Sequence, residues 1–129
     1  MRLTLIFLVI ISCGAAAVTA QHGGKAEPKR IVFAAGRSDA VLRGSLRNGQ
    51  EMEYVFSARK GQRITVKNAN TSMFDVRIFS GEFDLETEFD SSRTFSIDAS
   101  DTGDYMLFVR KKMTGGSGNS RFSVTLSIR

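Results

Sequence analysis

Apolar and polar side chains alternate with a period of two through most of the chain after residue 30. This alternation is typical of strands with one buried face, and it recurs in about eight short runs. No window of ten or more residues in this part has the 3.6-residue period of a helix. The apolar members of the runs are Ile31 and Phe33; Ala40, Leu42, Gly44 and Leu46; Met52, Tyr54, Phe56 and Ala58; Ile64 and Val66; Phe74, Val76 and Ile78; Phe95 and Ile97; Tyr105, Leu107 and Val109; and Phe122, Val124, Leu126 and Ile128.

Turn-forming pairs fall between these runs, including Asn48-Gly49, Lys60-Gly61 and Thr102-Gly103. Gly61 is expected to take the positive φ that a hairpin turn requires. Short strands at this spacing predict an all-β domain over residues 30–129, an antiparallel, jelly-roll-like β-sandwich of about eight strands. Its core should hold Phe56, Tyr105, Leu107 and Val124, with the Tyr105 hydroxyl bonded to nearby backbone.

The first twenty residues form a different kind of segment. Arg2 precedes an apolar run over residues 3–11, and small residues lead to Ala20, which predicts a secretory signal peptide over residues 1–20. The run is too short for a membrane span. Residues 21–29 read as a flexible polar tether. The protein is therefore expected to be periplasmic or secreted; lipidation at Cys13, which follows a lipobox-like sequence, is the less favoured alternative.

The composition argues against an enzyme and against a metal or other cofactor. One His and one Cys cannot supply a zinc site or an intrachain disulfide. The single His22 lies in the tether, so no serine has a plausible base nearby. We therefore expect no catalytic residues.

Acidic residues alternate with apolar ones over residues 82–90. A calcium site is conceivable, but a straight strand spreads its carboxylates about 6.6 Å apart, too far for one ion. A glycosidase carboxylate pair is a weaker alternative, because no cleft is recognisable. A solvated, acidic edge strand is the favoured interpretation.

The charge of the chain is +5, and basic residues gather where one strand ends in a long Gly-Ser loop. A basic loop on a rigid sandwich would enter an acidic protein cleft favourably. Nucleic acid is not expected, because no aromatic residues interleave with the basic ones. A solvated loop of no special role remains the alternative. The expected partner-binding residues at this end are Arg47, Asn48, Arg110, Lys111, Lys112, Met113 and Arg121.

Several segments together resemble a known family of bacterial domains. They are Phe33-Ala34-Ala35-Gly36-Arg37-Ser38, Gly44-Ser45-Leu46, the run from Tyr54 through Ala58-Arg59-Lys60-Gly61-Gln62, Thr102-Gly103-Asp104-Tyr105, and Phe122-Ser123-Val124-Thr125-Leu126-Ser127-Ile128. The chain is similar to the pre-peptidase C-terminal domain-like β-sandwiches, and more narrowly to the periplasmic inhibitors of goose-type lysozyme.

This resemblance implies a non-enzymatic binding domain whose partner is a lysozyme or another envelope protein. The alternative it leaves open is an accessory sandwich that binds cell-envelope carbohydrate or accompanies a secreted peptidase. The chain has Met113-Thr114-Gly115-Gly116 where those inhibitors tend to carry Arg-Asn-x-x-Arg, and Asn48-Gly49-Gln50 where they tend to have an aromatic residue.

Overall fold

The computed structural model describes residues 27–113 and 118–129, and these residues form nine strands and no helix. The predicted signal peptide, the Cys13 alternative, His22 and most of the tether lie outside the described residues. The strands are β1 (Lys29–Arg30), β2 (Asp39–Leu46), β3 (Glu51–Ala58), β4 (Arg63–Asn68), β5 (Phe74–Ser80), β6 (Leu85–Glu86), β7 (Thr94–Asp98), β8 (Gly103–Lys111) and β9 (Ser120–Ile128).

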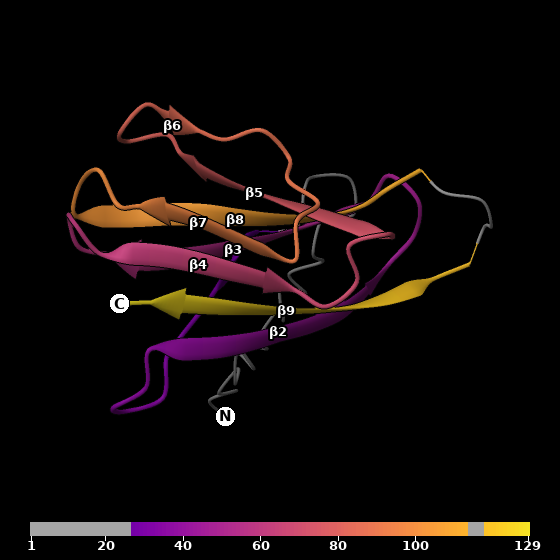
Figure 1. The fold of residues 1–129 in the computed structure, drawn as a ribbon, viewed down its shortest axis with the longest axis horizontal. Coiled ribbons are helices and arrows are strands. Elements are labelled where there is room, and N and C mark those ends of the chain that lie inside the picture. The colour runs from indigo at the N-terminus through magenta and orange to yellow at the C-terminus, as the bar shows by residue number, and fades with distance from the viewer. Residues whose placement is uncertain (1–26, 114–117) are drawn as a thin grey trace, which may run out of the picture.

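Two sheets make up the molecule (Figure 1). One has the strand order β1-β3-β8-β5-β6 and the other β2-β9-β4-β7. All neighbouring strands are antiparallel except β1 and β3, which pair in parallel. The prediction of an all-β sandwich is confirmed. In the described part of the chain, nothing forms a helix long and apolar enough to cross a membrane.

Side chains from both sheets meet in one core. Phe74 of β5 packs its ring edge-on against Phe122 of β9, with ring centroids 5.7 Å apart, and this contact joins the two sheets. The four residues expected at the centre, Phe56, Tyr105, Leu107 and Val124, are all fully buried. The register predicted from the alternation is therefore confirmed at the centre of the sandwich.

Two predicted connections are also confirmed. The buried Tyr105 hydroxyl donates to the carbonyl of Asp101 at 2.5 Å and accepts from the Asp101 amide at 3.1 Å. These bonds satisfy the polar group of an otherwise apolar ring. Gly61 has a φ of +87°, which a residue with a Cβ rarely adopts.

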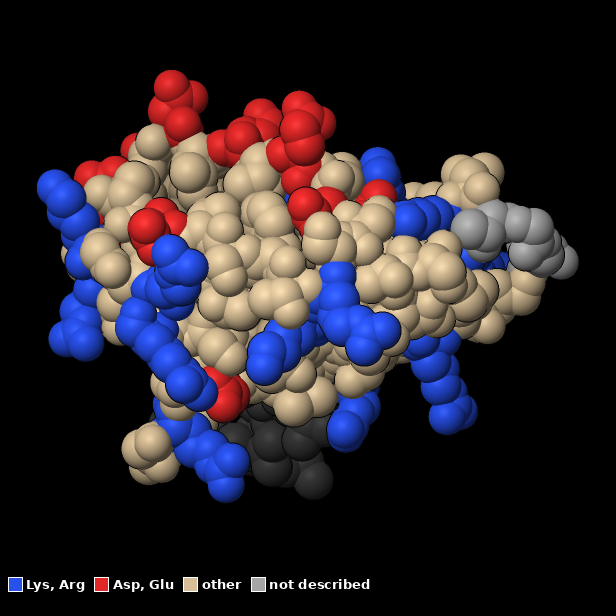
Figure 2. All heavy atoms as spheres, in the orientation of Figure 1, with Lys and Arg blue, Asp and Glu red and all other residues tan. Residues whose placement is uncertain are grey.

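The prediction of an edge strand over residues 82–90 is only partly right. The segment does lie at the edge of the five-stranded sheet, but its strand is limited to Leu85–Glu86, with an isolated bridge from Asp90 to Val76. Asp84 has a φ of +52°, so the backbone turns there instead of continuing extended. Phe83 turns inward against Tyr105, with ring centroids 5.5 Å apart. The carboxylates still point outward, and Figure 2 shows them gathered above β6.

The first predicted strand is also displaced. Ile31 and Phe33 were expected to lie within a strand, yet β1 ends at Arg30. The Ile31 amide still donates to the Val55 carbonyl at 2.8 Å. Both apolar side chains pack against the core, so the alternation identified the correct inward residues without a full strand.

Candidate protein-binding surface

Three connections meet at one end of the sandwich, on the right in Figure 1. They meet there because β2, β4 and β8 end on this side while β3, β5 and β9 begin on it. We call residues 47–50, 69–73, 111–113 and 118–119 the loop end. It contains five of the seven residues that the sequence suggested for partner binding.

The turn over residues 47–50 is fixed to the end of β8. The Arg47 amide donates to Oε1 of Gln50 at 2.8 Å, and the Gln50 amide donates back to the Arg47 carbonyl at 3.0 Å. Gly49 closes the turn with a φ of +77°. Its amide donates to the Lys111 carbonyl at 2.9 Å, while the Lys111 amide donates to the Gln50 carbonyl at 3.0 Å. The turn is thus an extension of the sheet.

Lys111 lies inside the protein. Its side chain is 2% exposed, and its Nζ donates to Oδ1 of Asn48 at 2.9 Å and to the Lys112 carbonyl at 3.1 Å. A buried ammonium is costly unless it is hydrogen-bonded, so these oxygens are what allow it there. Lys111 and Asn48 therefore support the surface from within, whereas the sequence suggested that they contact a partner.

Lys112 connects β8 to the loop over residues 69–73. Its amide donates to the Met73 carbonyl and its Nζ to the Thr71 carbonyl, both at 2.9 Å. The buried side chain of Asn68 holds the other side of this loop. Its Nδ2 donates to the Phe74 carbonyl at 2.8 Å, and its Oδ1 accepts from the backbone amide of Asn70 at 3.1 Å. Sequence reasoning did not single out Asn68; a polar residue at an inward position of the β4 pattern was the available signal.

Arg110 lies on the outer face of the five-stranded sheet and is already paired. Its Nε and Nη2 donate to the two carboxylate oxygens of Asp75 at 3.0 and 2.6 Å. The guanidinium also stacks 3.7 Å from the ring centroid of Phe89. The hydrogen bonds to Asp75 raise the pKa of Arg110 above its ordinary value. Its charge is therefore largely compensated within the protein.

Met113 and Arg47 are both exposed at the loop end. Met113 is 81% exposed, and a Cβ placed on Gly49 would lie 3.3 Å from its sulfur, so the thioether lies against the turn. Nε of the exposed Arg47 donates to Oδ1 of Asn119 at 3.2 Å. Arg121 is exposed too, but it points outward from β9, on the outer face of the other sheet.

No group of three or more His, Cys, Asp or Glu side chains comes together within residues 27–113 and 118–129.

Solved structures of other proteins have a fold similar to that of this chain. The structure is similar to the periplasmic g-type lysozyme inhibitor PliG of Aeromonas hydrophila, with a TM-score of 0.67, 22% identity and coverage of 79% of this chain and 96% of that one. PliG of Salmonella Typhimurium matches with a TM-score of 0.63 and 23% identity, over 81% of this chain and 99% of the other.

A solved structure of a second kind is also similar. The pre-peptidase C-terminal domain of a Bacillus anthracis collagenase matches with a TM-score of 0.53 and 17% identity, over 84% of this chain and all of that domain. No protein-family model and no curated protein matches the sequence. The fold is therefore that of the lysozyme inhibitors and pre-peptidase C-terminal domains, as the sequence resemblance suggested.

Proposed function

We propose that this chain is an exported, non-enzymatic inhibitor of a goose-type lysozyme, and that it binds the enzyme through the loop end. The observation that carries the proposal is the composition of this surface. The exposed thioether of Met113 lies against Gly49 of the turn over residues 47–50, which backbone bonds fix to β8, and the exposed Arg47 begins the same turn. The likeness of fold to PliG supports the same assignment.

The chemistry of this surface suits an enzyme cleft. Methionine and arginine are enriched at protein interfaces, and methionine adapts its shape to an apolar pocket. Glycosidic cleavage generally uses carboxylates, so a cation entering the cleft would be favoured electrostatically. A surface that is already rigid loses little conformational entropy on binding. The hydrogen bond from the buried Lys111 to the Asn48 side chain supports that rigidity beneath the surface.

The proposal assigns different roles to the candidate residues. Arg47, Lys112 and Met113 make the contact, while Asn48 and Lys111 support it. Arg110 belongs to the supporting structure as well, because Asp75 already binds its guanidinium. Arg121 lies at the margin, where a charge mainly affects the rate of association.

A lysozyme inhibition panel tests this proposal, with goose-, chicken- and invertebrate-type enzymes. The exported protein should slow goose-type lysozyme, and the double variant Arg47→Ala, Met113→Asp should weaken inhibition more than about tenfold, because it removes the central contacts. Lys60→Ala is the matched control: Lys60 is exposed and lies at the opposite end of the sandwich, so inhibition should not change.

Absence of inhibition of every enzyme in the panel would overturn the proposal. The accessory-domain alternative would then take its place, supported by the likeness of fold to the collagenase domain.

A further inference from the structure

The outer face of the four-stranded sheet carries a second arrangement of charge, which shares only Arg121 with the residues of the proposed inhibitor function. Five cations project outward from β2, β4 and β9 or from the residue just after β9: Arg43, Arg63, Lys67, Arg121 and Arg129. We call this surface the cationic face. Figure 2 shows Lys and Arg spread over it, whereas most of the visible Asp and Glu gather over β6.

Hydroxyl groups fill the centre of the cationic face. Thr125 of β9 is paired with Lys67 of β4, and Ser127 is paired with Thr65. The Thr65 hydroxyl in turn lies 3.0 Å from that of Ser96 on β7. The strands therefore present rows of hydrogen-bonding groups between the cations, about 4.8 Å apart across the sheet.

Arg43 and Arg121 are the least compensated of the five cations, because the carboxylate of Asp39 lies close enough to Arg129 and Lys67 for both, after its hydrogen bond with Ser127, to lower its pKa. Arg63 pairs with Asp98 at 3.3 Å and Arg129 with Asp39 at 3.6 Å, and these exposed pairs are individually weak. Within the described residues, no hydrogen bond or ion pair involves the side chains of Arg43, Lys67 or Arg121. This face therefore keeps a net positive charge.

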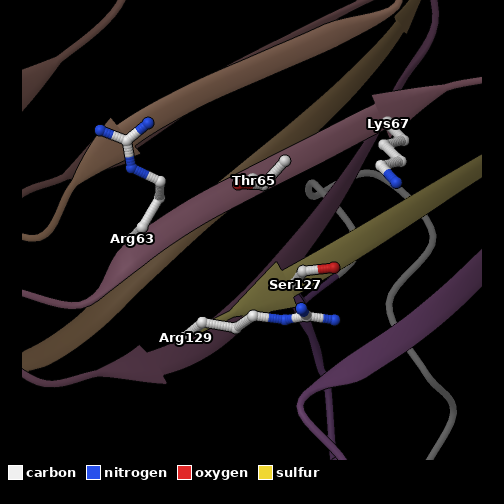
Figure 3. Close-up of a pocket in the computed structure, with 5 residues that line it drawn as sticks. All are labelled: Arg63, Thr65, Lys67, Ser127 and Arg129. Atoms are coloured by element: carbon white, nitrogen blue, oxygen red, sulfur yellow. The ribbon is translucent and has the colours of Figure 1, made fainter.

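Two hollows mark the cationic face. One of about 200 Å³ is lined by Arg63, Thr65, Lys67, Ser127 and Arg129, and Figure 3 shows these side chains on the adjacent strands β4 and β9. The other, of about 470 Å³, is lined by Arg43, Arg121 and Ser123 on this face and by Ala69 and Asn70 of the loop end. The hollows thus lie toward opposite ends of β9, which joins them.

We propose that the cationic face binds a polyanionic polysaccharide, one that bears carboxylate, phosphate or sulfate groups along its length. The polymer lies along β9, where Arg121 and Arg129 are eight residues apart, about 27 Å in an extended strand. The cations bind its anionic groups and the serine and threonine hydroxyls bind its sugar hydroxyls.

The makeup of this face favours a polysaccharide over other polyanions. Val41 is the only large apolar side chain that the strands of this face expose, so the surface lacks the apolar centre of a protein interface and the apolar stripe of a membrane-binding helix. Its aromatic residues, Phe95 and Phe122, pack inward. No ring is therefore available on β2, β4, β7 or β9 for the stacking that single-stranded nucleic acid uses.

A binding titration tests the proposal. The exported protein is titrated with polygalacturonate and heparin as anionic glycans, with neutral dextran, with duplex DNA and with vesicles of anionic phospholipid. The face variant Arg43→Glu, Lys67→Glu is compared with Arg59→Glu, Lys60→Glu, which makes the same change of charge at the far turn. Neither pair includes a contact residue of the loop end.

We expect the anionic glycans to bind more tightly than dextran, DNA or vesicles, and to bind less tightly as salt is added. The face variant should weaken glycan binding more than tenfold and the control less than threefold. A milder pair, Arg43→Gln with Lys67→Gln, should weaken it by an intermediate factor and keeps the test valid if the glutamate variant fails to fold. Equal losses in face and control variants, tighter binding of DNA or vesicles, or no binding of either glycan would overturn the proposal.

Discussion

Lys111 is the only buried lysine among the described residues, and its position is explained by its neighbours. Its ammonium donates hydrogen bonds to the Asn48 side-chain oxygen and the Lys112 carbonyl, which take the place of water. Its backbone carbonyl accepts from the Gly49 amide, and its backbone amide donates to the Gln50 carbonyl, so both groups bond to the turn over residues 47–50. One residue therefore joins β8 to the surface that we assign to the partner.

Replacing this ammonium tests that role. Lys111→Met keeps most of the side-chain volume but leaves the two oxygens without this donor, which should lower the free energy of unfolding by about 1–3 kcal/mol. Urea denaturation measures the change. Lys60→Met, in an exposed turn, should have almost no effect. Equal stability of the two variants would show that the buried bonds contribute nothing.

Asp104 gives the fold a dependence on pH. The Ser57 hydroxyl donates to Oδ1 of Asp104 at 2.8 Å and Arg30 to Oδ2 at 2.6 Å. These contacts, the Ser57 bond first and then Arg30, lower the pKa of Asp104 below its ordinary value of 3.8. A carboxyl with a lowered folded-state pKa stabilises the fold above its unfolded pKa, and this contribution is lost as the pH falls through the folded value.

Comparing Asp104→Asn with the unchanged protein isolates this effect. Near pH 6 the variant should be less stable, by no more than about 1 kcal/mol because the pair is partly exposed. The difference should shrink below about pH 4, as the native carboxyl protonates. Thermal melts over a pH series measure it. A difference that stays constant down to pH 2 would contradict the assignment.

At the scale of elements, the acidic segment over residues 81–93 is held by its apolar residues. Phe89 stacks on the guanidinium of Arg110 at 3.7 Å and on that of Arg77 at 5.0 Å. Val76 and Asp90 exchange two backbone hydrogen bonds at 3.0 and 2.7 Å. These contacts replace the regular strand pairing that the segment lacks after Glu86.

Phe89→Ala should therefore loosen this segment and leave the sandwich intact. We expect the Asp90 amide to exchange its hydrogen at least about tenfold faster, because the ring that holds the segment is gone. Amides of β9 should exchange as before. Glu88→Ala, at an exposed neighbouring position, is the control. If the Asp90 amide exchanges at the same rate in both variants, the stacking of Phe89 on Arg77 and Arg110 does not hold the segment.

At the scale of the whole molecule, the alternation of apolar residues was enough to predict the sandwich. It identified the inward face of β3, β8 and β9 correctly because one face of each strand lines the common core, although the acidic segment also buries Phe108 on the outer face of β8. It failed where a turn interrupts the alternation, as at Asp84, since the pattern of side chains does not report backbone dihedrals.

The sequence indicated which candidate residues gather at one end of the fold, but not which of them are buried or already paired. Sequence placed Arg47 and the basic residues after β8 at one end of the fold, and five of its seven residues lie there. It could not foresee that Arg110 pairs with Asp75, because the two residues are 35 positions apart and become neighbours only through the pairing of β5 and β8. The burial of Lys111 likewise depends on a tertiary partner, Asn48.

The central claim is that the loop end, and not another part of the sandwich, contacts a goose-type lysozyme. Amide hydrogen exchange of the chain, alone and with saturating enzyme, tests it most directly. If the loop end makes the contact, exchange should slow over residues 47–50, 69–73 and 111–113 and stay unchanged at the opposite turns around Gly61 and Thr102 and on the outer face of β4. Slower exchange at those turns or on β4, or no change anywhere in the chain, would contradict it.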